Sequence, residues 1–262
     1  MIYFPAIVLC LAAWWVARND ALKASIRSEA SAMLDEAMRD PNLAVHLVRV
    51  SGGSPALRAY LTEKLQPLVG VSSMRLDVGR LRQDVEALGP VHSASVSLSP
   101  KGILKVAVIE RYPAALWRDF AGSLFVVDRK GVVISPAAAR ADFPDLVVLL
   151  GEGALRNVPE ALSVIDAAPL FTPRLRGMVR VGERRWDMVL DRDQTIMLPS
   201  EGAPEAAARV MALSMGENEL ADRDLSVIDM RDAARPVLRM TPRAAESWLT
   251  EQASEPEEGE DT

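Results

Sequence analysis

Apolar and polar residues alternate in two runs between residues 93 and 108. Serines occupy every second position of the first run, which predicts a half-buried strand with one solvated face. The sequence Pro100-Lys101-Gly102 predicts a turn before the second run. The apolar positions are Ala94, Val96 and Leu98 in the first run and Leu104, Val106 and Val108 in the second. Together the two runs predict a β-hairpin with one buried face.

Two helices are predicted before this hairpin. Asp77 can cap the first turn of the later helix, and Gly89-Pro90 ends it. Ser54 can cap the earlier helix, where Pro55 occupies the favoured first position. Their apolar stripes consist of Leu81, Val85 and Leu88 in the later helix and Leu57, Leu61, Leu65 and Leu68 in the earlier one. Each helix therefore has one face to bury against the hairpin.

A strand predicted at residues 46–50 completes a unit at residues 45–113. Its order is strand, helix, helix, strand, strand, which is close to the smallest unit that can bury a face by itself. Residues 114–252 instead contain short strands and turns, with some helices. The strands are predicted within 115–119, 124–128, 132–135, 145–150, 177–198, 225–231 and 236–241, and helices at 154–170, from Pro204 and at 242–252. The predicted fold class is α+β, with a mixed, mostly antiparallel β domain.

Four motifs follow one another in a fixed order. They are VIERYPAALW at 108–117, LFVVDRKGVVI at 124–134, FPDL at 143–146 followed by Gly151, and RRWDMVL at 184–190. The element order of residues 45–113 resembles a POTRA domain. Over residues 45–242, the motifs and their order resemble the FtsQ/DivIB family of bacterial cell division proteins.

This resemblance implies a non-enzymatic scaffold of the divisome. Such a protein binds FtsB and FtsL through its C-terminal β domain and joins early cytoplasmic division proteins to the later septal peptidoglycan machinery. A POTRA protein of outer-membrane assembly or secretion is an alternative, but the alternating strands here are too short for its transmembrane barrel. A periplasmic cell-wall enzyme is a further alternative, which a pocket with paired, perturbed carboxylates would support.

Residues 2–17 carry no charge and predict a membrane anchor at residues 1–17. A helix of this length spans about 24 Å of a hydrocarbon core of about 30 Å, so interfacial tryptophans complete the span. A signal-peptide apolar region and a buried core helix are the alternatives. The residues assigned to the membrane are Ile2, Phe4, Ile7, Val8, Leu9, Leu11, Trp14 and Trp15.

The charges beside this segment and the resemblance disagree about its orientation. Arg18, Lys23 and Arg27 follow the segment and no basic residue precedes it, so the positive-inside rule favours a cytoplasmic C-terminal side. The resemblance implies the opposite: a single-pass inner-membrane protein at the division septum, with its bulk in the periplasm. We follow the family and expect basic residues upstream of this start. Residues 18–44 predict a helical spacer.

The net charge of −6 comes mostly from residues 253–262. These residues hold five acidic side chains and no basic one, so −6 less −5 leaves −1 for the remainder. A nearly neutral body does not favour nucleic acid as a partner, and the acidic segment predicts a disordered tail. One cysteine, Cys10, and the isolated His46 and His92 make a metal site or a Cys–His nucleophile improbable. We therefore expect no cofactor.

The sequence contains no recognisable catalytic constellation. The G-x-S-x-G, H-E-x-x-H and Walker motifs are absent. Asp187 and Asp191 share a strand face, but their positions lie about 13 Å apart, which is too far for a glycosidase pair. Gly151 and Gly153 lack the third glycine of a dinucleotide-binding loop. These observations predict a protein that is not an enzyme and has no small-molecule substrate.

Two segments are candidates for a partner surface. Residues 184–186 form either a hairpin whose Trp packs inward or a basic surface for acidic partner residues. Residues 236–241 form either an ordinary strand or a sheet edge that accepts an extended partner segment. The resemblance implies Arg231 as a contact, because Ile228–Arg231 is similar to the family's V-D-L-R segment; Asp232 replaces the family's aromatic residue. The residues assigned to partner binding are Arg184, Arg185, Trp186, Arg231, Val237, Leu238, Arg239 and Met240.

Overall fold

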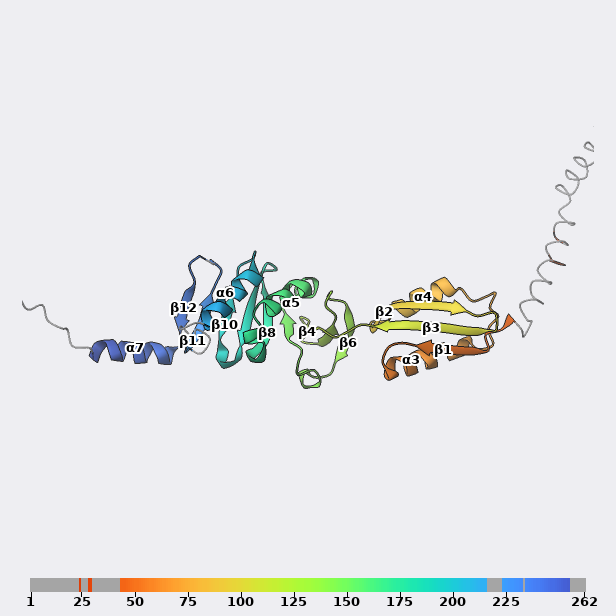
Figure 1. The fold of residues 1–262 in the computed structure, drawn as a ribbon, viewed down its shortest axis with the longest axis horizontal. Coiled ribbons are helices and arrows are strands. Elements are labelled where there is room, and N and C mark those ends of the chain that lie inside the picture. Colours follow the sequence, from red (N-terminus) through yellow and green to blue (C-terminus); the bar gives the residue numbers. More distant parts are fainter. Residues whose placement is uncertain (1–23, 25–27, 30–42, 216–222, 233, 255–262) are drawn as a thin grey trace, which may run out of the picture. The chain divides into compact units, whose positions relative to one another are not determined.

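The computed structural model of the chain describes residues 24, 28–29, 43–215, 223–232 and 234–254 (Figure 1). The chain divides into two compact units, Met1–Glu110 and Arg111–Thr262. The predicted membrane anchor, with its assigned residues from Ile2 to Trp15, lies outside the described residues, as do nearly all of the spacer and the acidic residues of the tail. Among the described residues, no helix has the length and apolar character needed to cross a membrane.

The first unit has the element order predicted from the sequence. Its elements are β1 (Leu47–Ser51), α3 (Pro55–Leu65), the 3-10 helix η2 (Gln66–Leu68), α4 (Val78–Glu86), β2 (Val91–Leu98) and β3 (Ile103–Glu110). Strand β3 is central, parallel to β1 and antiparallel to β2. In register, Val96 lies opposite Val106 and Leu98 opposite Leu104, so the predicted apolar face of the hairpin is confirmed.

Both helices of the first unit begin at their predicted caps. The side chain of Ser54 accepts a hydrogen bond from the backbone N–H of Leu57 at 3.2 Å, and that of Asp77 accepts one from Arg80 at 2.9 Å. Pro67 ends the regular α-helix, so Leu68 lies in η2 rather than on α3 as expected. Both helices cover one face of the sheet, and the core contains Leu57, Leu61, Leu65, Val85, Leu104, Val106 and Val108.

The second unit is built around one nine-stranded mixed sheet with the order β12-β11-β10-β9-β8-β7-β4-β5-β6. Five neighbouring pairs are antiparallel and three are parallel. The strands are β4 (Ala115–Arg118), β5 (Leu124–Val127), β6 (Val133–Ala137), β7 (Val148–Leu150), β8 (Leu175–Val181), β9 (Arg185–Leu190), β10 (Thr195–Met197), β11 (Leu225–Asp229) and β12 (Val237–Met240). The helices are α5 (Val158–Ala167), α6 (Ala203–Met215) and α7 (Pro242–Ser254), with short 3-10 turns η3 (Arg140–Asp142), η4 (Leu155–Asn157), η5 (Pro169–Arg174) and η6 (Asp191–Asp193).

Prolines explain where this unit departs from the expected elements. The helix expected at 154–170 is divided into η4, α5 and η5, because Pro159 suits only a first helical turn and Pro169 cannot continue one. The strand expected at 145–150 begins only at Val148, since the residues after Pro144 form a turn.

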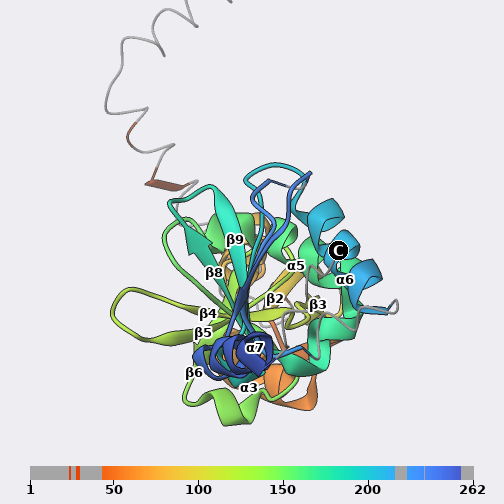
Figure 2. The same ribbon diagram turned by 90° about the vertical axis from the view of Figure 1, so that its left-hand side faces the viewer.

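Helices α5 and α6 pack on one side of the strands (Figure 2). A cross-strand row of buried residues faces them, formed by Leu149, Met178, Met188, Ile196 and Ile228. Because successive side chains of a strand alternate faces, the next row lies on the opposite face. That row runs through Leu150, Val179, Asp187, Met197, Asp229 and Val237. It combines apolar and charged side chains.

Candidate partner-binding surface

Strand β12 lies at an edge of the nine-stranded sheet and, among the described strands, pairs with β11 alone. All four of its residues are exposed, with fractional exposures of 62% for Val237, 42% for Leu238 and 44% for Met240. The prediction that this strand forms a sheet edge is confirmed. An exposed apolar edge strand is a template for pairing with another chain.

The backbone of β12 offers donors on its free side. The N–H of Thr241 donates to the carbonyl oxygen of Asp224 at 3.0 Å. Successive amides of an extended strand point to opposite sides in the plane of the sheet. The amides of Val237 and Arg239 therefore face β11, whereas those of Leu238 and Met240 face the free side.

The side chains of β12 extend two different rows of the sheet. Leu238 is in register with Ile228 and continues the row that packs under the helices. Val237 is in register with Asp229 and continues the row on the opposite face. A strand added to this edge would thus meet an apolar side chain on each face.

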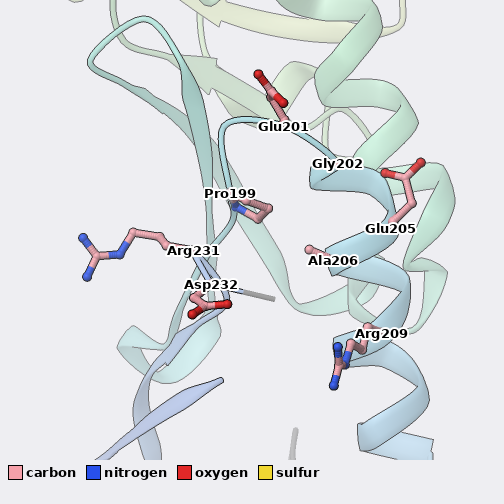
Figure 3. Close-up of a pocket in the computed structure, with 8 residues that line it drawn as sticks. All are labelled: Pro199, Glu201, Gly202, Glu205, Ala206, Arg209, Arg231 and Asp232. Atoms are coloured by element: carbon pink, nitrogen blue, oxygen red, sulfur yellow. The ribbon is translucent and has the colours of Figure 1, made fainter. Parts of the chain in front are cut away.

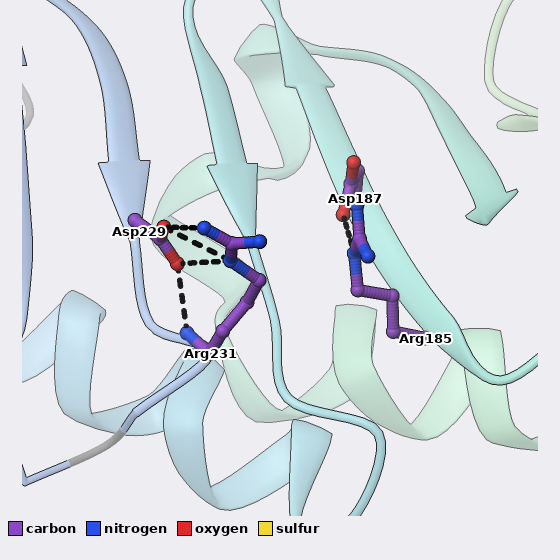
Figure 4. A network of polar contacts seen from close by, with 4 residues as sticks. All are labelled: Arg185, Asp187, Asp229 and Arg231. Carbon is purple, nitrogen blue, oxygen red and sulfur yellow. Dashed lines mark hydrogen bonds and ion pairs between the residues drawn. The ribbon is translucent and has the colours of Figure 1, made fainter. Parts of the chain in front are cut away.

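Arg231 follows β11 and forms a close ion pair with Asp229 (Figure 4). Its Nε donates to both carboxylate oxygens at 2.9 Å, and its Nη2 donates to Oδ2 at 2.6 Å. The hydrogen bond from this side chain outweighs partial burial and holds the pKa of Asp229 below its usual value. Nη1 makes no hydrogen bond to any residue that the structure describes, and the side chain is 56% exposed.

A second ion pair joins Arg185 and Asp187 on the same face of the sheet, with Nε 3.2 Å from Oδ1 (Figure 4). Met197 lies opposite both Asp187 and Asp229, so these two positions are two strand spacings, about 10 Å, apart. The charge of Arg185 contributes to lowering the pKa of Asp229. The two pairs therefore form one charged row, which is internally neutral.

The structure corrects the place of Trp186 in the candidate surface. This residue is fully buried, because β9 directs it toward α5. Its indole N–H donates to Glu160 at 3.2 Å, and the Arg180 guanidinium stacks on its ring at 5.1 Å. Trp186 therefore belongs to the core, whereas Arg184 is exposed in the turn between β8 and β9.

The structure brings together only part of the predicted contact set. Arg185, Arg231, Val237 and Arg239 lie on or beside the face opposite the helices, as the strand registers require. Leu238 and Met240 point to the other face of the same edge. Which of these residues touch a partner remains a prediction.

Sequence reasoning missed a shallow pocket between α6 and the segment after β11 (Figure 3). Its volume is about 540 Å³, and its lining residues are Pro199, Glu201, Gly202, Glu205, Ala206, Arg209, Arg231 and Asp232. Figure 3 shows the Arg231 guanidinium pointing away from the pocket. The only feature of the sequence that pointed to this pocket was a glycine, Gly202, directly before the start of a helix. In the structure its φ is +71°. The mixed charges of the lining do not define a ligand.

The aspartates considered for catalysis have separate structural partners. Asp187 binds Arg185, whereas Asp191 accepts a hydrogen bond from Arg174 Nε at 2.8 Å. That hydrogen bond, foremost among several causes, lowers the pKa of Asp191. Within the described ranges, no group of His, Cys, Asp or Glu side chains could hold a metal ion.

Comparison with known proteins gives consistent matches. Residues 115–231 match the model of the cell division protein FtsQ/DivIB C-terminal family. The chain is 42% identical to the cell division protein FtsQ of Roseobacter litoralis over 245 residues, which cover 93% of this chain and 83% of that protein. It is 36% identical to FtsQ of Paracoccus denitrificans over 257 residues, covering 98% and 75%.

A solved structure of the major extracytoplasmic domain of the cell division protein DivIB from Geobacillus stearothermophilus is also similar, with a TM-score of 0.31 and 13% identity. It covers 42% of this chain and 96% of that domain.

Proposed function

Because this chain belongs to the FtsQ/DivIB family of cell division proteins, we propose that it is a non-enzymatic divisome scaffold that captures FtsB and FtsL through the edge strand β12. The observation that carries this proposal is the exposed edge strand beside Arg231, with its apolar residues Val237, Leu238 and Met240. Membership of this family favours the divisome role over the alternative role of an outer-membrane assembly or secretion protein. Residues 45–113 serve in this proposal as a POTRA-like domain and residues 114–252 as the binding domain.

Capture occurs by addition of a strand to the sheet. An extended partner segment accepts hydrogen bonds from the free amides of Leu238 and Met240, and alternate partner side chains meet the two faces of β12. Main-chain pairing supplies affinity, while the contacts of the alternate side chains supply specificity. The short strand β12 limits unwanted pairing to a few residues.

Arg231 supplies a charged contact beside the strand. Asp229 holds Nε and Nη2, which fixes the plane of the guanidinium and leaves Nη1 directed elsewhere. A partner carboxylate binds Nη1 without displacing Asp229. Since Asp229 already neutralises one charge, this contact contributes more to register and specificity than to affinity.

The anchor in this proposal is residues 1–17, with the bulk of the chain in the periplasm at the septum of the inner membrane. Anchoring in the same membrane as its partners raises their effective concentration. The uncharged run of residues 2–17 supports the anchor. A reporter enzyme fused after Thr262 tests the orientation, because activity only in the periplasm is expected and cytoplasmic activity would contradict it.

The decisive test is capture of a purified FtsB–FtsL pair by the full chain in detergent. Leu238→Pro removes one free-side donor without removing a bond to β11, so we expect capture to weaken by about tenfold or more. Leu238→Val keeps the donor and is the matched control. Circular dichroism must first show that both variants are folded. Equal capture by Leu238→Pro and Leu238→Val would place the interface elsewhere, with the first unit as the next region to test.

A further inference from the structure

Four arginines follow one another at every fourth position from the end of β11 to the start of α7. They are Arg231, Arg235, Arg239 and Arg243, and all four are exposed. Between residues 231 and 243, Asp232 is the only acidic residue, so the segment carries a net charge of +3. We call Arg235, Arg239 and Arg243 the arginine strip. Among the residues that the structure describes, none of these three side chains has an ion-pair partner.

The strongest opposite charge in the chain lies close by in the sequence. Residues 255–262 contain Glu255, Glu257, Glu258, Glu260 and Asp261 and no basic residue. Helix α7, which begins at Pro242 and contains Arg243, separates this acidic segment from Arg235 and Arg239. The rest of the chain carries −1, because −6 for the whole less −5 for the segment leaves that value.

The acidic segment is long enough to reach the strip. Helix α7 has 13 residues, so it spans about 20 Å from Ser254 back to its first turn. Eight extended residues span about 26 Å. A segment that turns back at residue 255 therefore passes Arg243, which lies in the first turn of α7, and approaches Arg239.

We propose that residues 255–262 dock on Arg239 and Arg243 of the arginine strip in the same chain and compete there with an acidic partner segment. A covalently joined segment has an effective concentration in the millimolar range, so weak ion pairing is sufficient for occupancy. The pairing is exposed and is therefore lost at high salt. The docking itself is independent of the proposed function; only the competition rests on it.

Zero-length cross-linking tests the docking directly. Arg239→Lys or Arg243→Lys, made separately in the full chain, places an amine within reach of the acidic segment, and a carbodiimide joins an amine to a carboxylate in contact. We expect mass spectrometry to find position 239 or 243 joined to residues 255–261, with several-fold lower yield in 0.5 M salt, where screening is strong, at about 3–5 Å. Native Lys130, exposed on the β5–β6 turn, is the internal control.

Three outcomes would overturn the docking. They are the absence of these cross-links, an equal yield at Lys130, and cross-links only between chains. A mixture of isotope-labelled and unlabelled protein distinguishes the last outcome, because it produces mixed-mass products. Cross-links only between chains would show that the acidic segment binds a second copy of the chain.

Partner capture tests the competition. The combined changes Glu257→Gln, Glu258→Gln and Glu260→Gln remove three charges from the acidic segment. We expect capture of the FtsB–FtsL pair to strengthen about three- to tenfold at low salt and to be unchanged at high salt. Unchanged capture at low salt would overturn the competition. Absence of any capture by the unmodified chain would overturn the proposed function instead, while the cross-linking result would still decide the docking.

Discussion

Two arginine–aspartate pairs of the second unit have similar geometry but different surroundings. Arg111 pairs with Asp128 at 2.8 Å, where the side chains are only 15% and 9% exposed. Arg231 pairs with Asp229 at 2.6 Å, where the exposures are 56% and 18%. In both pairs the pKa of the aspartate lies below its usual value. The same pair of residue types thus stabilises the fold at Arg111 and Asp128, whereas at Arg231 and Asp229 it remains accessible to solvent.

The Arg111–Asp128 pair is part of the turn between β5 and β6. Asp128 Oδ1 accepts hydrogen bonds from the backbone N–H groups of Lys130 at 2.9 Å and Val132 at 2.8 Å. Burial raises the pKa of Asp128, but these bonds and the one from Arg111 outweigh it. Gly131 completes the turn at a φ of +79°, where a Cβ would lie 2.2 Å from the Leu155 carbonyl oxygen. Both oxygens of this carboxylate therefore accept hydrogen bonds within the fold, Oδ1 from the turn and Oδ2 from Arg111.

The largest expected effect is the loss of the buried pair. Asp128→Ala removes the carboxylate that pairs with the half-buried Arg111 and two hydrogen bonds of the turn, so we expect a loss of about 3–5 kcal/mol in the free energy of unfolding. Denaturant melts of the full chain in detergent measure it. Asp166→Ala is the control, because its pair with Arg129 is 69% and 64% exposed and should change stability by less than about 0.5 kcal/mol. Equal losses would show that burial does not distinguish the pairs.

Charge reversal at the exposed pair should act on binding. Arg231→Glu replaces attraction with repulsion of a partner carboxylate and of Asp229, so we expect capture of the FtsB–FtsL pair to weaken about ten- to a hundredfold, and less at high salt. Arg118→Glu makes the same charge change at an exposed residue of β4 and is the control. If both variants weaken capture equally, the effect is one of net charge and the assigned contact is wrong.

The two pairs should differ in how much they contribute to the pH dependence of stability in acid. A carboxylate whose folded pKa is depressed stabilises the fold fully above its unfolded pKa of about 3.9, and this stabilisation is lost as the pH falls through the folded value. Both aspartates therefore contribute fully at neutral pH and lose their contribution below about pH 4. We expect Asp128→Asn to flatten the acid limb of a stability–pH curve more than Asp229→Asn does. A steeper acid limb for Asp128→Asn would show that the sign is wrong.

The smallest expected effect is on stability at the exposed pair. Arg231→Ala removes a solvent-exposed ion pair, and such pairs contribute about 0–1 kcal/mol. Asp229 remains partly solvated after the change, so its charge is not stranded. A thermal melt should shift by no more than a few degrees. A loss as large as that of Asp128→Ala would mean that the Asp229 pair has a structural role of its own.

The sequence predicted the first unit well because its signals are local. Alternating serines identify the solvated face of β2, and Ser54 and Asp77 identify helix starts through bonds that span three residues. The edge position of β12 was also predictable, since Pro242 follows it and begins a helix. Each of these features is set by residues near one another in the chain.

The charged row could not be predicted because it depends on distant registers. Asp187 and Asp229 come together only because β10 pairs antiparallel with β9 and parallel with β11. The burial of Trp186 likewise requires α5 to bring Glu160 to the indole, from 26 residues away. An alternating pattern gives two faces for β9, but only packing decides which face the helices cover.

Strand β12 is also the last strand of the sheet in the order of synthesis, among the strands that the structure describes. Its only partner, β11, is likewise made after the rest of the sheet. In the proposed function, the edge that captures the partner therefore does not exist while the chain is still emerging, and a product that stops before residue 237 lacks it. Because β12 is synthesised last among these strands, only chains made at least through this strand can bind the partner by the proposed strand addition. Incomplete chains are therefore excluded from assembly without a separate quality-control factor.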